Sequence, residues 1–254
     1  MNDDLYIYLL LYVDDMLIAS KIKEEIEDLK KILSSEFDMK NLWIAKKILG
    51  VEIEGNQAVG LMFLSQKKYL TRVLYSFQML NSKPVVTPLT AHFRLSNLQS
   101  PKTSEEKLEM EDVPYANAVG CLMYAMVLTR PDISHAVSVV SRYMATPRKE
   151  HWKAVKWIMR YLSGTLSCGL VYGKNKGSCE GLLGFVDSDY AGDLDKRRSL
   201  TCYMFLFNGC LINWKATLQH VVALSTIEAE DTAATEVVKE ALWLQGLMRE
   251  LGVK

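Results

Sequence analysis

The stretch Leu9–Ser20, LLLYVDDMLIAS, sets two adjacent aspartates in the middle of an apolar run. Charge is absent from Leu5 to Val13 and the apolar run resumes at Met16, so both flanks predict short buried strands with Asp14 and Asp15 on the turn between them. Aspartate is a common turn residue in its own right, because its side chain bonds to its own backbone. Clustered carboxylates on a rigid turn also suit an enzyme that holds two divalent metal ions about 3.5–4 Å apart. The stretch alone leaves a plain hairpin and a metal-binding hairpin open.

Composition describes an ordinary globular protein. The chain has 254 residues, 49% of them hydrophobic, which is enough for a core in one or two domains. Lys plus Arg and Asp plus Glu both number 30, so any nucleic-acid binding must be local. The start, MNDDLYIYLL, lacks the basic segment of a signal peptide, and its apolar run is shorter than the roughly 20 residues that span a bilayer. We expect an intracellular protein, cytoplasmic or nuclear, that is neither secreted nor in a membrane.

Cysteine and histidine usage narrows the kind of metal site to expect. The five cysteines form no CxxC pair, and the four histidines are scattered. This pattern predicts reduced, mostly buried thiols rather than disulfides or zinc ligands. A metal site in this chain is therefore expected to use carboxylates.

The region after the opening hairpin predicts a helix and a second hairpin. Apolar residues at helical spacing favour an amphipathic helix over Lys23–Phe37. The runs Ile48–Ile53 and Ala58–Leu64 predict two strands joined at Gly55-Asn56.

A further helix and a loop follow. Helical spacing of apolar residues predicts a helix over Ser65–Leu80. The polar segment His92–Val113, with its acidic run SEEKLEMED, predicts a loop or tether. Three basic residues of the helix either contact a phosphate backbone or simply face water: Lys67, Lys68 and Arg72.

Three helices are expected between Pro114 and Thr165, with Pro131 and Pro147 at helix starts. The last of them contains PRKEHWKAVKWIMRYL, which mixes tryptophans with basic residues as expected where a helix contacts nucleic acid. A buried tryptophan stripe with extended basic side chains explains the same pattern. The basic residues are Arg148, Lys149, Lys153, Lys156 and Arg160.

A second domain is expected after the linker Tyr172–Ser178, YGKNKGS. Strands are predicted at Leu183–Tyr190, Leu200–Phe207 and Cys210–Trp214. The dipeptide Asn208-Gly209 is a strong hairpin signal and joins the last two.

The final helix is predicted to begin just after Ser225, because Ser225 and Glu228 have the spacing of a capping box. Its apolar stripe, followed backwards through Ala234, reaches Glu230, which is therefore expected at the edge buried against the sheet. A carboxylate in that position is costly unless a cation meets it, and Asp187 on the first strand is a candidate partner for a shared metal ion. A position at the rim, in contact with water, is the alternative for Glu230.

Eight stretches, in order along essentially the whole chain, resemble the C-terminal part of the Pol polyprotein of copia-type LTR retrotransposons, most like plant elements. No single motif decides the resemblance, but their shared order leaves little room for chance. The stretches are LLLYVDDMLIAS, AKKILGVEI, LSQKKYLTRVL, SKPVVTPL, VPYANAVGCLMYAMVLTRPDISHAV, EHWKAVKWIMRYLSGT, GFVDSDYAGDLDKRRS and VALSTIEAE.

The resemblance implies an α+β fold in three parts. Residues 1–64 resemble the C-terminal part of a reverse transcriptase palm, with its hairpin. Residues 65–175 resemble the helical thumb and connection, with the polar loop at 92–113. Residues 176–254 resemble a truncated RNase H-like domain of three antiparallel strands and a helix.

The resemblance also implies roles for four carboxylates. Asp14 and Asp15 are expected as catalytic metal ligands of the polymerase, and Asp187 and Glu230 as those of the RNase H. The implied cofactor is Mg²⁺, with Mn²⁺ as a substitute. The implied partners are an RNA–DNA hybrid or primer–template and the remaining parts of Pol.

Both implied sites are expected to be incomplete, because the family draws further carboxylates from segments that precede and follow these motifs. Two carboxylates bind Mg²⁺ weakly, since the ion prefers octahedral oxygen geometry and gives up water reluctantly. The sequence thus favours a fragment of a reverse transcriptase/RNase H whose chemistry belongs to a longer polypeptide. The alternatives are an inactive remnant that at most binds nucleic acid, and an unrelated α+β interaction protein. The sequence does not define the oligomeric state.

Overall fold

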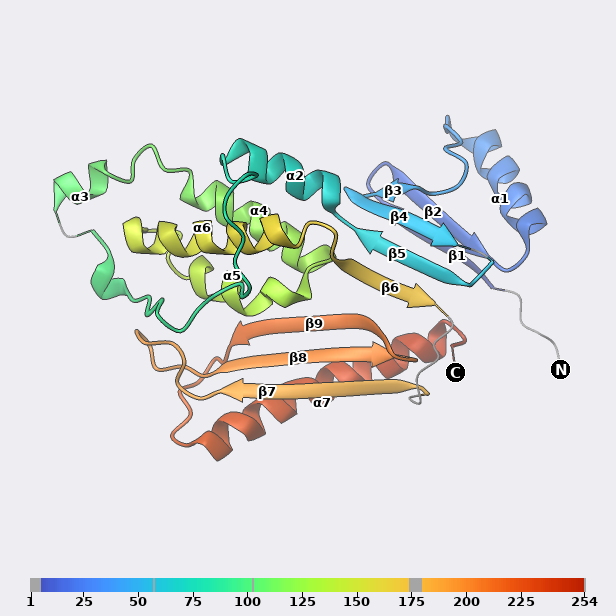
Figure 1. Ribbon diagram of the computed structural model, residues 1–254. Coiled ribbons are helices and arrows are strands. Elements are labelled where there is room, and N and C mark those ends of the chain that lie inside the picture. The colour runs from blue at the N-terminus through green and yellow to red at the C-terminus, as the bar shows by residue number, and fades with distance from the viewer. Residues whose placement is uncertain (1–5, 57, 102, 174–179, 254) are drawn as a thin grey trace.

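The computed structural model describes residues 6–56, 58–101, 103–173 and 180–253. Within them the chain is a mixed structure of helices and three antiparallel sheets, with strand orders β1-β2, β3-β4-β5-β6 and β7-β8-β9 (Figure 1). The expected combination of helices with antiparallel strands is confirmed.

The N-terminal hairpin consists of β1 (Ile7–Tyr12) and β2 (Asp15–Ser20), followed by α1 (Lys23–Glu36). The expected hairpin and helix are confirmed. The expected burial of the strands is wrong, because every residue of β1 is exposed, from 39% for Tyr8 to 62% for Leu11. Within the described part of the chain, β1 and β2 pair only with each other, so no further strand extends this sheet.

The second sheet contains β3 (Lys47–Ile48), β4 (Val51–Asn56), β5 (Leu61–Ser65) and β6 (Gly169–Gly173). The predicted strand Ile48–Ile53 is interrupted by a turn at Leu49-Gly50, where φ is 49° and 74°. The predicted turn at Gly55-Asn56 is also wrong. Pairing continues to Asn56 and Leu61, because the strands extend beyond the glycine and turn only afterwards.

Strand β6 was not predicted, and it returns the chain to the second sheet by pairing with β5. Gly169 is needed at this close approach, because a Cβ there would collide with the Leu64 carbonyl and the Phe63 ring. The first two residues of the predicted linker Tyr172–Ser178 belong to β6. Residues 174–178 of that linker lie outside the described residues.

The middle of the chain is mainly helical: α2 (Lys67–Ser76), α4 (Tyr115–Leu128), the short η2 (Pro131–Ile133), α5 (Ser134–Ser141) and α6 (Lys149–Gly164). We call these elements the helical unit. Helix α2 lies inside the range predicted for it, and the three helices expected after Pro114 are confirmed. The largest buried cluster lies here, and each fully buried Leu or Ile contributes roughly 1.5–3 kcal/mol. Its fully enclosed side chains include Leu74, Leu122, Ile158 and Leu162.

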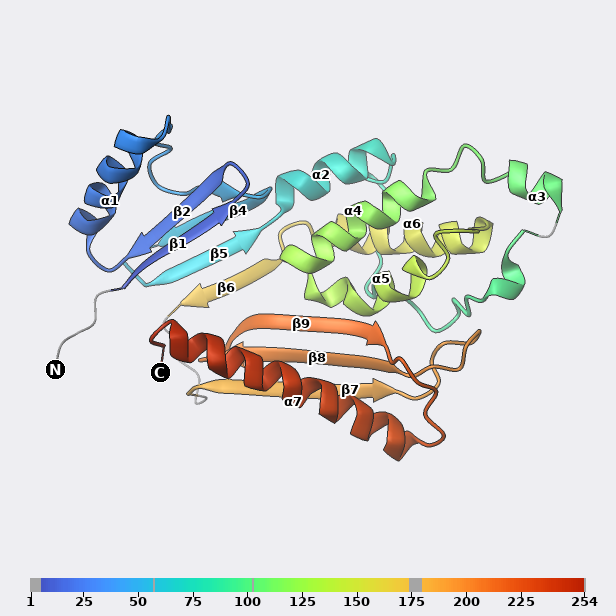
Figure 2. The same cartoon turned by 180° about the vertical axis from the view of Figure 1, so that it is seen from behind.

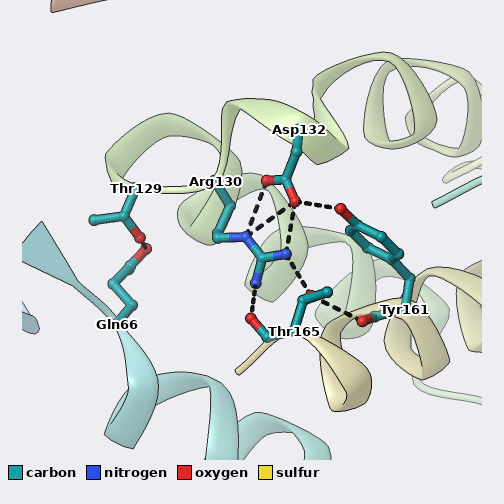
Figure 3. Close-up of polar contacts among 6 residues, drawn as sticks. All are labelled: Gln66, Thr129, Arg130, Asp132, Tyr161 and Thr165. Atoms are coloured by element: carbon teal, nitrogen blue, oxygen red, sulfur yellow. Dashed lines mark hydrogen bonds and ion pairs between the residues drawn. The ribbon is translucent and has the colours of Figure 1, made fainter. Parts of the chain in front are cut away.

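A buried arginine ties these helices together (Figure 3). Arg130 is 1% exposed and pairs with Asp132 through Nε and Nη2, at 2.9 and 2.7 Å. Its Nη1 donates to the carbonyl oxygen of Thr165 at 3.0 Å, and the Tyr161 hydroxyl donates to Asp132 at 2.8 Å. Burial opposes ionisation of Asp132, but hydrogen bonds from Arg130 and its charge outweigh burial and hold the pKa of Asp132 below its usual value. The buried guanidinium is therefore paired with a carboxylate, and each of its three nitrogens donates to an acceptor.

The segment 92–113 contains η1 (Asn97–Gln99) and α3 (Ser104–Leu108), and it is docked rather than free. Leu95 and Met110 are buried, and the Tyr143 hydroxyl donates to the Leu95 carbonyl oxygen at 2.8 Å. Of the two alternatives, loop or tether, the tether is therefore wrong, because the few apolar residues within this polar segment anchor it.

The C-terminal part comprises β7 (Leu182–Asp189), β8 (Leu200–Phe207), β9 (Cys210–Leu218) and α7 (Thr226–Glu250), as predicted apart from a longer third strand. Asn208 and Gly209 form the turn with φ of 48° and 74°. Ser225 Oγ accepts from Glu228 N at 3.1 Å and so caps α7. No helix in the described part of the chain is long and apolar enough to cross a membrane.

Helix α7 covers one face of the sheet β7-β8-β9, and the helical unit contacts the sheet at its edge strand β9. Figure 2 shows α7 crossing one face of the sheet. On that face Gln219 donates to Thr201 Oγ1 at 3.1 Å and to the Ala229 carbonyl of α7 at 2.8 Å. On the other face, Trp214 Nε1 donates to the Met126 carbonyl of α4 at 3.0 Å.

Candidate carboxylate sites and nucleic-acid interface

The two N-terminal aspartates lie at the tip of the hairpin. Val13 and Asp14 form the turn, and Asp15 pairs with Tyr12. Both carboxylates are exposed. Val13 has φ of 51°, a conformation that is unusual for a β-branched residue and costs of order 1–3 kcal/mol. Backbone strain of this kind concentrates at functional sites, so the turn is the part of the hairpin that stability alone does not explain.

The described residues do not fit a complete metal centre at this turn. Mg²⁺ requires near-octahedral oxygen coordination, and two-metal sites share several carboxylates. Among residues 6–56, 58–101, 103–173 and 180–253, no group of three or more His, Cys, Asp or Glu side chains could hold a metal ion. Asp14 and Asp15 therefore supply two carboxylates without a third, and no metal-dependent step follows from them.

Asp187 lies in β7, directly opposite Cys202 of β8. Burial raises the pKa of the Cys202 thiol to about 11, and the nearby charges of Asp187 and Asp189 add to this. Strand alternation puts Cys202 on the same face as Trp214, the face opposite α7, and this face is exposed at Asp187. Asp187 therefore projects from the face opposite α7.

Glu230 does not lie where its helical stripe predicted. Glu230 and Ala234 are exposed, whereas Ala229 and Ala233 are fully buried against the sheet. From Val237 the buried stripe continues to Ala233 and Ala229, in steps of four residues. The prediction instead took a step of three from Val237 to Ala234 and so reached Glu230. Helix α7 packs on the face of the sheet opposite the one from which Asp187 projects, and both carboxylates are exposed. The catalytic roles of Asp14, Asp15, Asp187 and Glu230 stay predictions.

The basic residues at the start of α6 are paired with the acidic segment. Arg148 Nη2 forms an ion pair with Glu106, and Lys149 Nζ lies 2.8 Å from Glu109 Oε1. Sequence reasoning missed this contact because it treated SEEKLEMED as a solvated tether. The complementary charges of the two segments were the available signal.

The basic residues further along α6 have no such acidic partner. Within the described ranges, Lys153, Lys156 and Arg160 form no ion pair. They line a groove of about 660 Å³ between α6 and the segment that begins at His92. The groove holds four cationic side chains, the fourth being Arg94, and a single carboxylate. It is therefore a concave, positively charged surface.

The same groove contains an aromatic cluster. The Trp157 ring has centroid distances of 5.5 Å to His92 and 5.7 Å to Phe93, both edge to face. Trp157 Nε1 donates to the Thr87 carbonyl at 2.9 Å, and the Arg160 guanidinium lies 5.0 Å from the Trp157 ring centroid. His92 and Phe93 were missed from the sequence, because nothing in a polar loop indicates which helix it will cover.

The basic residues of α2 form a separate group. Lys67 and Arg72 are exposed, and Lys68 Nζ lies 2.9 Å from Glu52 of β4. Arg72 lines a second, more open groove of about 550 Å³ beside Tyr124. The structure therefore divides the predicted nucleic-acid-binding residues into two surfaces. In the described residues, the groove on α6 combines several cations without an ion pair with aromatic rings, whereas the groove beside Tyr124 has Arg72 as its single cation.

Comparisons with known proteins define the class to which these features belong. Residues 2–91 match the family model described as reverse transcriptase (RNA-dependent DNA polymerase). The chain is 54% identical over 252 residues to the retrovirus-related Pol polyprotein from transposon TNT 1-94 of Nicotiana tabacum, which covers 99% of this chain and 19% of that protein. It is 34% identical over 248 residues to the Pol polyprotein from transposon RE1 of Arabidopsis thaliana, covering 98% and 16% respectively.

A third relative matches at nearly full length. An uncharacterized mitochondrial protein of Arabidopsis thaliana is 37% identical over 239 residues, which is 93% of each chain. No solved structure matches the chain. The chain belongs to the reverse transcriptase-containing Pol polyproteins of transposons, and it spans less than a fifth of the length of the two Pol polyproteins it matches.

Proposed function

We propose that the chain is the reverse transcriptase/RNase H portion of a copia-type Pol polyprotein, which synthesises DNA on RNA and cleaves RNA in RNA–DNA hybrids. The order of its motifs and the identity to plant Pol polyproteins support this assignment. The hairpin with Asp14 and Asp15 is then the polymerase palm motif. The strand with Asp187 and the helix with Glu230 are then parts of the RNase H portion. The three parts are 1–64, 65–175 and 176–254.

Within these 254 residues, the activity we propose is binding of nucleic acid rather than catalysis. Catalysis of both kinds depends on divalent metal ions, and among the described residues each carboxylate position offers at most two of the ligands that such a centre needs. Chemistry then requires the remaining parts of Pol. The proposed ligand is an RNA–DNA hybrid or primer–template, met inside the cell.

The observation that carries binding is the charge of the α6 groove. Lys153, Lys156 and Arg160 project from one helix whose other side is fully buried, so the cations are held by a rigid support. When these side chains contact phosphates, they release the salt counterions bound there. The logarithm of the binding constant then falls with the logarithm of the salt concentration, with a slope of about −0.9 per phosphate contact.

The test is the salt dependence of binding to an RNA–DNA hybrid by fluorescence anisotropy. The wild-type affinity should fall steeply between low and physiological salt, and Lys153→Ala/Lys156→Ala should flatten the slope by about 2. The matched control removes two lysines from α1, Lys30→Ala/Lys31→Ala, which pair with Glu27 and Asp28. The proposal would be refuted if the affinity did not change with salt concentration, or if the control variant flattened the salt slope as much as Lys153→Ala/Lys156→Ala.

A further inference from the structure

The groove on α6 has a composition that a purely phosphate-binding surface does not need. A duplex presents phosphates to a protein while its bases remain stacked and paired inside. Cations alone would serve such a ligand. The groove instead places His92, Phe93 and Trp157 beside Lys153 and Lys156. Aromatic rings next to cations are the features by which proteins hold unpaired nucleotides, because every base has a face that can stack.

The size of the groove also suits a nucleotide unit. Its volume of about 660 Å³ lies inside the range of roughly 300–1,000 Å³ typical of sites for small organic molecules. A duplex can touch the rim of such a groove but cannot enter it. A base and its phosphate from a single strand can do so.

The walls of the groove are held in place by the rest of the fold. On one side α6 is anchored by fully buried Ile158 and Met159. On the other, Leu95 is buried and its carbonyl accepts from Tyr143, while Asn97 N donates to Asp195 at 2.8 and 2.9 Å. A site whose walls are already ordered loses little conformational entropy when it binds.

The rings are oriented so that one of them remains available. Arg160 lies over the Trp157 ring and donates from Nε to the Lys83 carbonyl at 2.7 Å, so it covers one part of the tryptophan. His92 is exposed and lies 4.2 Å from the Phe93 ring centroid. The exposed imidazole is therefore the ring that an incoming base meets first, with Lys153 and Lys156 placed for its phosphates.

We propose that this groove binds an unpaired nucleotide of single-stranded nucleic acid, with the base against the His92 and Trp157 rings and the phosphate on Lys153 and Lys156. The inference rests on the proposed nucleic-acid binding and specifies the substrate as a single strand, such as an end or an unpaired stretch beside a hybrid. A hybrid would then touch the same lysines at the rim of the groove, with its paired bases outside.

The experiment compares two probes on the same protein in EDTA: a fluorescein-labelled oligo(dT) of about 12 nucleotides and an RNA–DNA hybrid of equal length. His92→Ala should weaken oligo(dT) binding by at least about 5-fold, as expected for the loss of one stacked base, and change hybrid binding less than twofold. Trp157→Leu should act in the same direction, with its folding checked by circular dichroism. Lys30→Ala/Lys31→Ala serves as the charge control.

Three results are informative. Selective loss of oligo(dT) binding in both ring variants supports the groove as a single-strand site. If both ring variants leave oligo(dT) binding unchanged, or weaken both probes by one common factor, the inference is wrong while nucleic-acid binding stands. If wild-type protein binds neither probe, the proposed function fails as well.

Discussion

The helical unit and the N-terminal hairpin differ in how completely they are built. The helical unit encloses Leu122, Ile158 and Leu162 fully and satisfies a buried guanidinium at Arg130. In the hairpin every residue of β1 is exposed, and its two strands pair only with each other in the described part of the chain. The first has a closed core, and the second has an exposed strand and a strained turn.

This difference separates the two kinds of function that the Pol family combines. The basic side chains proposed to bind nucleic acid lie on α6, whose opposite side is buried in the core of the helical unit. The carboxylates proposed for catalysis stand on the hairpin and on the sheet with α7, without a third ligand in the described residues. Binding should therefore be a property of this chain, whereas chemistry should need more of the polyprotein.

The largest effect should come from opening a cavity in the helical unit. Leu162→Ala removes a fully buried side chain and should lower the free energy of unfolding by about 2–5 kcal/mol. Leu11→Ala, in the hairpin, removes a side chain that is 62% exposed and should cost less than about 1 kcal/mol. Urea denaturation followed by circular dichroism measures both. Similar losses would show that the hairpin is buried in solution.

The polar network of the helical unit should be nearly as sensitive. Arg130→Ala leaves the Thr165 carbonyl without its donor and Asp132 without its positive partner, and it should destabilise the protein by about 3 kcal/mol. Asp14→Asn, on the exposed turn, should change stability by less than about 0.5 kcal/mol. If Arg130→Ala left the free energy of unfolding unchanged, water would replace the guanidinium without penalty.

A smaller effect should sharpen the comparison on the binding surface. Glu106→Gln/Glu109→Gln removes the two acidic partners of Arg148 and Lys149, so the basic face of α6 extends by two cations. Hybrid affinity at low salt should rise by roughly 3–10-fold and the salt slope should steepen. Glu236→Gln, whose partner Lys239 lies on α7, is the control. Equal affinity in all three proteins would place this end of α6 outside the interface.

The smallest effect concerns pH. His151 is fully buried in the helical unit, and burial lowers its pKa below the usual 6.5, with a partial opposing contribution from the Ser96 backbone. The unfolded chain therefore binds a proton at His151 more readily than the folded chain does. The free energy of unfolding is highest above pH 6.5 and falls as the pH drops below this value. His151→Gln should remove part of this dependence between pH 7 and pH 5. An identical slope in the variant would contradict the assignment.

Local signals in the sequence predicted most of the elements correctly. Asn208-Gly209 marks its hairpin because both residues accept positive φ, and Ser225 marks the start of α7 because its hydroxyl caps the helix. Gly55-Asn56 misled because a turn dipeptide does not prevent strands from pairing beyond it. Strand β6 was hidden because its partner lies about a hundred residues away in the sequence.

The candidate site was predictable only in part. The basic residues of α6 were found from composition, but their division into paired and free cations depends on the fold of segment 92–113. The face of Glu230 was mistaken because steps of three and four residues both continue a helical stripe, and only packing chooses between them. Long-range contacts of this kind have no local signal.

The most direct test of the separation between binding and chemistry is an RNA cleavage assay. The chain is incubated with a labelled RNA–DNA hybrid and Mg²⁺ or Mn²⁺, at a concentration where anisotropy shows the hybrid to be bound, beside Asp187→Asn. We predict bound hybrid with no RNA cleavage above that of the variant. Cleavage by the wild type that disappears in Asp187→Asn would contradict the account, because this chain would then hold a working metal centre.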